Sequence, residues 1–279
     1  MHALIDSVNS IYALLQIGLC ALTGTAPLVL AMIFVHDLTY YPLYLATFFL
    51  SAPGFAAMFA SFRDCPSLSS RNGKIRSNLI ESVFNQGETL PDWIAKPYIE
   101  LGSNRIFIPF WRAYVHLAIR SWVTTLPLAF VCFCLMYDIQ IVAAFKWSIF
   151  IVPPMVSCVV LLIQACFVAL VLVVEYPKAK LWPTIRNAVL LSVRRWYMLL
   201  ISVLAGAGYI WGLARFPILV ALLVTGLIGY IIWGSARWQA NSFLVQMARE
   251  SGDKHIIALY RPQEQGDVQG SSPLADFKQ

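Results

Sequence analysis

Six apolar segments, each long enough to cross a lipid bilayer, constrain this chain more than any other feature. They cover approximately residues 10–35, 39–62, 117–136, 147–174, 196–214 and 216–234. A helix needs about 20 apolar residues to cross a hydrocarbon core of ~30 Å. Only 12% of the residues are charged, against about 25% in soluble domains, so the chain lacks the polar surface of a soluble globule. The sequence therefore predicts an all-α fold, a polytopic transmembrane helical bundle.

The distribution of basic residues predicts the orientation of these segments. Of the 20 Lys and Arg residues, all except Lys146 and Arg215 lie in the connections 63–116 and 175–195, near the start of the third segment, or in the C-terminal part. Because basic loops stay on the cytoplasmic side, we expect both termini to be cytoplasmic. The six spans then form three hairpins in the cell membrane. We expect a membrane domain over residues 1–245 and a polar, largely disordered cytoplasmic tail over 246–279.

The three hairpins have related sequences. TGTAPLVLAMIF in the first span aligns with VTTLPLAFVCFC in the third, and both contain a Thr-x-Pro-Leu core that starts at Thr25 and Thr125. The fifth span has SVLAGAGYIWGL at the equivalent place, without a proline. We therefore consider a threefold hairpin repeat.

Short interfacial helices are predicted on the cytoplasmic side. One lies over 74–86 in NGKIRSNLIESVFNQG, a second begins at Pro109 and runs into the third span, and a third is TIRNAVLLSVRRWYML. These helices either anchor at lipid headgroups or dock a cytoplasmic partner. The candidate contact residues are Ile75, Leu79, Ile80, Val83 and Phe84 of the first helix, Arg112 of the second, and Arg186, Arg194 and Arg195 of the third.

Small residues indicate where helices pack closely. Gly54, Ala56 and Ala60 lie in the stretch SAPGFAAMFASFRDC, and Gly208 and Gly212 form a G-x-x-x-G pair in the fifth span. Such spacing lets helix backbones approach each other.

Few polar side chains fall within the predicted spans. We expect Arg63 to mark the exit of the second span into the cytoplasm, and Glu175 to lie at a span end where its charge reaches the interface. Gln164 is the strongly polar side chain deep in a span, and an interhelical hydrogen bond is the favoured interpretation over a place on a substrate path.

Signatures of catalysis are missing from the sequence. It contains no G-x-x-x-x-G-K-[ST] phosphate loop and no H-E-x-x-H motif, and the four histidines are scattered. We therefore predict a protein that is not an enzyme, with no catalytic, cofactor-binding or metal-binding residue and no nucleic-acid partner.

Several motifs resemble the YesL-like family of bacterial membrane proteins, a family of unknown function. They are GTAPLVLAMIF, APGFAAMFASFRD, FWRAYVHLAIRSW and IRNAVLLSVRRWYMLL, in the order found in that family and within residues 10–235. The chain departs from the family near Thr25, where members often have a longer turn, and in its tail. The resemblance implies six helices and an association with carbohydrate uptake.

Two functions follow as expectations. The first is a non-enzymatic accessory or assembly component associated with carbohydrate uptake, in contact with membrane lipids and with subunits of an ATP-driven sugar importer. The alternative is a small-solute transporter or channel in its own right, with its path between the hairpins and a homo-oligomer as one option.

Overall fold

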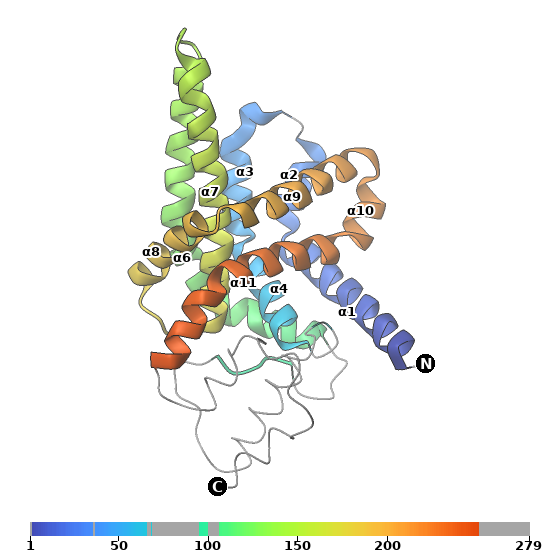
Figure 1. Ribbon diagram of the computed structural model, residues 1–279. Helices are drawn as coiled ribbons and strands as arrows, with labels where there is room; N and C mark the ends of the chain where they lie inside the picture. The colour runs from blue at the N-terminus through green and yellow to red at the C-terminus, as the bar shows by residue number, and fades with distance from the viewer. Residues whose placement is uncertain (1, 36, 66–67, 69–94, 100–105, 251–279) are drawn as a thin grey trace. The chain divides into compact units, whose positions relative to one another are not determined.

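Helices account for the regular structure of the residues described by the computed structural model, which are 2–35, 37–65, 68, 95–99 and 106–250. The elements are α1 (His2–Gly24), α2 (Ala26–Phe34), the short 3₁₀ helix η1 (Leu38–Tyr40), α3 (Tyr41–Leu50), α4 (Ala52–Asp64), α6 (Phe107–Val142), α7 (Ser148–Glu175), α8 (Leu181–Arg194), α9 (Tyr197–Arg215), α10 (Pro217–Leu223) and α11 (Thr225–Glu250) (Figure 1). The chain divides into units of Met1–Ala240 and Asn241–Gln279. Of the second unit, the structure describes the last turns of α11, residues 241–250.

Within the described ranges, four helical segments are long and apolar enough to cross a membrane: Ser7–Gly24, α6, α7 and α9. The number rises to six if each bent pair counts as one span, α3 with α4 and α10 with α11. The outer side of α6 exposes large apolar side chains, among them Val115 and Ile119, which are 73% and 74% exposed. Such a surface suits lipid rather than water. These features define an all-α protein of the multi-pass membrane class.

The first two predicted spans are each interrupted. The expected span 10–35 is divided at Thr25, whose φ of −111° and ψ of 18° lie outside the α-helical values. The expected span 39–62 bends by 48° at the break between α3 and α4. A proline lies in the first turn after each break, Pro27 in α2 and Pro53 in α4. Because proline has no N–H to donate to the preceding turn, it favours a new helix start.

The two breaks meet each other inside the bundle. The backbone N–H of Leu28 donates to Ser51 Oγ at 3.3 Å, and Ser51 Oγ donates to the carbonyl of Thr25 at 3.5 Å. Gly54 packs directly on Gly24, where an added Cβ would lie 2.5 Å from the Gly24 carbonyl carbon. Irregular backbone is tolerated at membrane depth only where other protein groups satisfy it. The junction therefore fixes α1 and α2 against α3 and α4.

Helices α6 and α7 form the longest hairpin and run side by side (Figure 1). The predicted helix starting at Pro109 and the third span are one continuous helix, α6, of 36 residues. At 1.5 Å per residue it is about 54 Å long, so it extends beyond one bilayer core. Thr125 and Pro127 lie inside this helix. The helix is therefore interrupted at the Thr-Pro motif in the first predicted span, but it continues through this motif in the third.

The last predicted spans also differ in their boundaries. The third predicted interfacial helix corresponds to α8, which ends at Arg194, so that residues 197–199 belong to α9 instead. The expected span 216–234 is the pair α10 and α11, bent by 54°, and α11 continues to Glu250. The buried face of α8 includes Ile185, Ala188 and Leu191, and this helix packs against α7.

Candidate functional site

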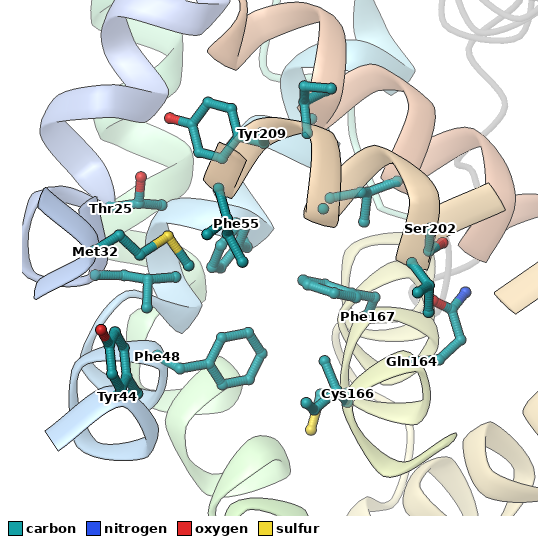
Figure 2. A pocket seen from close by; sticks show the side chains of 18 of the residues that line it. Thr25, Met32, Tyr44, Phe48, Phe55, Gln164, Cys166, Phe167, Ser202 and Tyr209 are labelled. Carbon is teal, nitrogen blue, oxygen red and sulfur yellow. The ribbon is translucent and has the colours of Figure 1, made fainter. Parts of the chain in front are cut away.

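A cavity of about 470 Å³ lies between the helices of the first unit (Figure 2). Side chains of α1, α2, α3, α4, α6, α7, α9 and α11 contribute to its walls. The lining is Ala21, Thr25, Leu28, Val29, Met32, Tyr44, Leu45, Phe48, Phe55, Met58, Ala129, Cys132, Val160, Ile163, Gln164, Cys166, Phe167, Leu199, Ser202, Val203, Gly206, Ala207, Tyr209, Ile210, Thr225, Ile228, Gly229 and Ile232. Most of these residues are aliphatic or aromatic, so the interior is suited to an apolar occupant.

Three aromatic rings from different helices meet at this cavity. Phe167 of α7 makes edge contacts with Phe48 of α3 and Phe55 of α4, at ring-centroid distances of 5.7 and 5.4 Å. Phe48 and Phe55 are themselves 5.7 Å apart. Figure 2 shows these rings between the two sides of the cavity. Edge-to-face contacts of this kind favour fixed ring positions.

The hydroxyl groups on one side of the cavity already donate to the protein. Thr25 Oγ1 donates to the Ala21 carbonyl at 2.7 Å, and the Tyr44 hydroxyl donates to the Val35 carbonyl. These bonds leave the two oxygens with lone pairs but no free hydrogen.

A second hydroxyl pair joins α9 to α11. Thr225 Oγ1 donates to the Ala221 carbonyl at 2.6 Å, so the Tyr209 hydroxyl must be the donor in its 2.7 Å bond to Thr225 Oγ1. Again the donor hydrogens are used within the protein, and only acceptor capacity remains.

Gln164 lies on the other side of the cavity, next to Ser202 (Figure 2). Its Nε2 donates to Gln239 Oε1 at 2.9 Å and to Ser235 Oγ at 3.3 Å, both on α11. Ser202 Oγ of α9 donates to the same Ser235 Oγ at 2.9 Å. The predicted interhelical hydrogen bond of Gln164 is confirmed, and it joins α7 to α11 beside the cavity.

A buried ion pair lies at the end of α4. Arg63 Nε donates to Asp64 Oδ1 at 2.6 Å, and both side chains are 0% exposed. Arg63 also donates to the carbonyls of Val174 and Lys96, at 2.6 and 3.3 Å. Asp64 Oδ2 accepts the backbone N–H of Tyr98 at 2.8 Å. Arg63 lies at the end of α4, where the span was expected to end, but its side chain is buried against α7 and the segment 95–99.

A second ion pair lies at the end of α7. Glu175 Oε1 accepts from Arg237 Nη1 at 3.3 Å, and the Glu175 side chain is 2% exposed. The Arg237 guanidinium also lies 5.2 Å from the centroid of the Trp233 ring, a cation–π contact. Glu175 lies at the end of a span as predicted, and its charge is paired within the protein. Together these side chains form a charge cluster of Arg63, Asp64, Glu175 and Arg237.

The charge cluster holds a short connecting segment. The backbone N–H of Ala95 donates to the Glu175 carbonyl at 3.3 Å, next to the bonds made by Lys96 and Tyr98. Burial raises the pKa of the Tyr98 phenol, which therefore stays protonated at neutral pH and bonds to His116 Nδ1 at 2.6 Å. Residues 95–99 are thus bound to α4, α6 and α7.

The predicted contact residues fall into two groups. Those of the helix at 74–86 lie outside the described residues: Ile75, Leu79, Ile80, Val83 and Phe84. The structure exposes Arg112 on α6 and Arg186 and Arg194 on α8. Arg195 differs from them, because its Nη1 donates to the Trp238 carbonyl at 2.6 Å.

Of the small residues predicted to pack between helices, all except Gly208 are buried. Gly54, Ala56 and Ala60 are buried in α4. Gly212 is buried, and an added Cβ there would lie 3.2 Å from Val220 Cγ2. An added Cβ at Gly208 would have no described atom within 4 Å. Two further close contacts involve α11, where Gly226 meets Gly18 of α1 and Gly229 meets Met58 of α4.

No sequence pattern predicted Asp64, Arg237 or the cavity as a site. The adjacent opposite charges of Arg63 and Asp64, directly after a run of small buried residues, were the available signal for the ion pair. Among the residues that the structure describes, no three His, Cys, Asp or Glu side chains gather where they could hold a metal ion.

Comparison of the chain with family models, with curated proteins and with solved structures found no match. The similarity to YesL-like proteins therefore stays a prediction from the sequence motifs.

Proposed function

We propose that this chain is a non-enzymatic, multi-pass membrane protein that binds an apolar molecule from the lipid phase in the cavity between its helices. The observation that supports this function is the nearly apolar lining of a 470 Å³ cavity. That volume falls in the range of about 300–1,000 Å³ found for small-molecule sites. A molecule dissolved in the bilayer reaches such a cavity without first entering water.

The hydrogen bonding of the lining argues against a sugar as the occupant. A sugar carries many hydroxyl groups, each of which loses its water on binding. The hydroxyls of Thr25, Tyr44 and Tyr209 are already bonded within the protein. The sugar oxygens would therefore find no donor among these groups and would stay unpaired as acceptors, at a cost of roughly 1–3 kcal/mol each.

A pair of glycines on α9 allows a matched test. Gly206 lines the cavity and Gly208 does not, and neither position has a described atom within 4 Å of an added Cβ. We expect the Gly206→Phe side chain to fill the cavity and the Gly208→Phe side chain to stay outside it, so that a ligand can still enter. Purified wild type and Gly208→Phe should then carry about one extractable apolar molecule per chain by mass spectrometry, and Gly206→Phe several-fold less. Equal amounts in all three proteins, or none in wild type, would contradict the proposal.

The proposal includes a topology of six spans in three hairpins with cytoplasmic termini. Its support is that the ends of α4 and α7 meet in the charge cluster with Arg237 of α11. The basic connections 63–116 and 175–195 therefore begin on the same side. Under the positive-inside rule, that side is cytoplasmic.

The resemblance to YesL-like proteins adds an accessory role in carbohydrate uptake to the proposal. In that role, the basic cytoplasmic connections contact subunits of an ATP-driven importer. Affinity purification of the tagged chain should then retrieve a nucleotide-binding subunit. Recovery of the chain alone would count against the accessory role without bearing on the cavity.

A small-solute transporter is the second candidate. Helix breaks at Thr25 and Ser51 lie close to the cavity, and broken helices surround the substrate site in many transporters. Uptake of solute by the purified chain in liposomes would support transport. Binding of an apolar molecule without any uptake would favour the first candidate.

A further inference from the structure

We propose that the apolar occupant carries one hydrogen-bond donor, the terminal hydroxyl of a long-chain alcohol, and that Gln164 Oε1 and Ser202 Oγ accept this hydrogen. The inference rests on the proposed binding function and specifies the chemical class of its ligand. It is carried by the direction of the hydrogen bonds on one side of the cavity.

Backbone carbonyls fix that direction, because they can only accept. Gln239 Nε2 donates to the Arg195 carbonyl at 3.0 Å, so Gln239 must turn its Oε1 toward Gln164. Gln164 must therefore present its NH₂ group to Gln239 and its own Oε1 elsewhere. A flipped Gln164 amide would place two oxygens against each other, so the network allows one orientation.

The serine hydroxyls are ordered in the same way. Ser235 Oγ donates to the Met198 carbonyl at 3.0 Å, so its lone pairs accept from Gln164 Nε2 and from Ser202 Oγ. The hydrogen of Ser202 is thereby used within the protein. Its oxygen keeps acceptor capacity on the cavity side.

Gln164 Oε1 is the acceptor left over by this network. Gln164 is 2% exposed and lines the cavity, and its Oε1 receives no hydrogen bond from any described residue. An acceptor atom that has no protein partner, on a side chain that is 2% exposed, is unfavourable. A ligand hydroxyl at this position supplies the missing donor.

The directions of these hydrogen bonds also exclude ligands whose polar group can accept a hydrogen bond but cannot donate one. The hydroxyl and amide hydrogens of Thr25, Tyr209, Thr225, Gln164 and Ser202 are all directed to protein acceptors. An ether or ester oxygen would find no donor among them and would face Gln164 Oε1. The cavity therefore distinguishes an alcohol from the ether of the same chain length.

Equilibrium binding of tritium-labelled hexadecanol to the full chain in detergent tests the inference, with the unlabelled alcohol and its methyl ether as competitors. We expect the alcohol to displace the label about tenfold better than the ether, the ratio for one hydrogen bond to an otherwise unpaired group. Both competitors partition into the same detergent, so each variant is judged by its alcohol-to-ether ratio relative to wild type.

Gln164→Leu should reduce this ratio severalfold, because Ser202 Oγ is then the one proposed acceptor left, while both competitors still bind because the apolar walls remain. Ser202→Ala removes the second acceptor without leaving Gln164 Nε2 unpaired, and should reduce the ratio about threefold. Ser157→Ala, on the exposed part of α7, is the matched control and should keep the wild-type ratio.

The outcomes separate the two proposals. A ratio near one in wild type, with both competitors bound, would overturn the donor inference and leave the binding function intact. Failure of the label to bind a wild-type protein that still yields an extractable apolar molecule would overturn the alcohol inference alone, and failure of both tests would overturn the binding function. An undiminished ratio in both Gln164→Leu and Ser202→Ala would show that these residues do not accept the hydroxyl.

Discussion

Replacing Arg63 with alanine should lower the free energy of unfolding by about 3–5 kcal/mol, the cost of breaking a buried ion pair. The carboxylate of Asp64 would stay buried and lose both of its bonds to the guanidinium. The Val174 and Lys96 carbonyls would lose their donor too. We expect the thermal midpoint of the purified protein in detergent to fall by about 10 °C.

Two controls make this expectation specific. Arg112→Ala removes an exposed arginine and should change the free energy of unfolding by no more than about 0.5 kcal/mol. The double variant Arg63→Met with Asp64→Leu removes both buried charges, and should recover much of the lost stability. If Arg63→Ala melts like the wild type, the pair is not buried in the membrane-embedded protein.

Gly54→Ala should also destabilise the protein, by about 3 kcal/mol. The added Cβ would lie 2.5 Å from the carbonyl carbon of Gly24 and 2.9 Å from Thr25 Cγ2. The carbonyl carbon belongs to backbone, which cannot move aside as a flexible side chain does. The two breaks would then separate, and the hydrogen bond from Leu28 to Ser51 would be lost.

Gly208→Ala is the matched control for this variant. It also replaces a helical glycine, but no described atom lies within 4 Å of the added Cβ. Because alanine favours helix by up to about 1 kcal/mol over glycine, this variant should be equally stable or more stable. Thermal midpoints measured in one detergent compare the two, and a Gly54→Ala protein as stable as Gly208→Ala would show that α1 and α4 do not meet at this point.

The break positions were partly accessible from sequence. Pro27 and Pro53 indicate that a helix is interrupted near them, because a proline has no backbone N–H to donate. Yet Pro127 lies within α6 without dividing it. Whether a proline ends a helix depends on partners such as Ser51, which satisfies the N–H of Leu28 from another helix.

The burial of charge could not be read from local sequence. Arg63 and Glu175 both follow apolar runs, where a charge normally turns toward water. Their burial is decided by residues 95–99 and by Arg237, which are distant in sequence and cover or pair with them. No local sequence pattern specifies that these distant residues contact Arg63 and Glu175.

The sequence by itself determined the class of this protein. Apolar segments of membrane-spanning length and a low content of charge require helices, because each backbone N–H and C=O must be satisfied within its own segment in lipid. Only the tertiary structure decided the cavity, the charge cluster and the orientation of Gln164. Each of these depends on side chains and carbonyls from separate helices, and the hydrogen bond that points Gln164 Oε1 away from Gln239 is set by a carbonyl at Arg195.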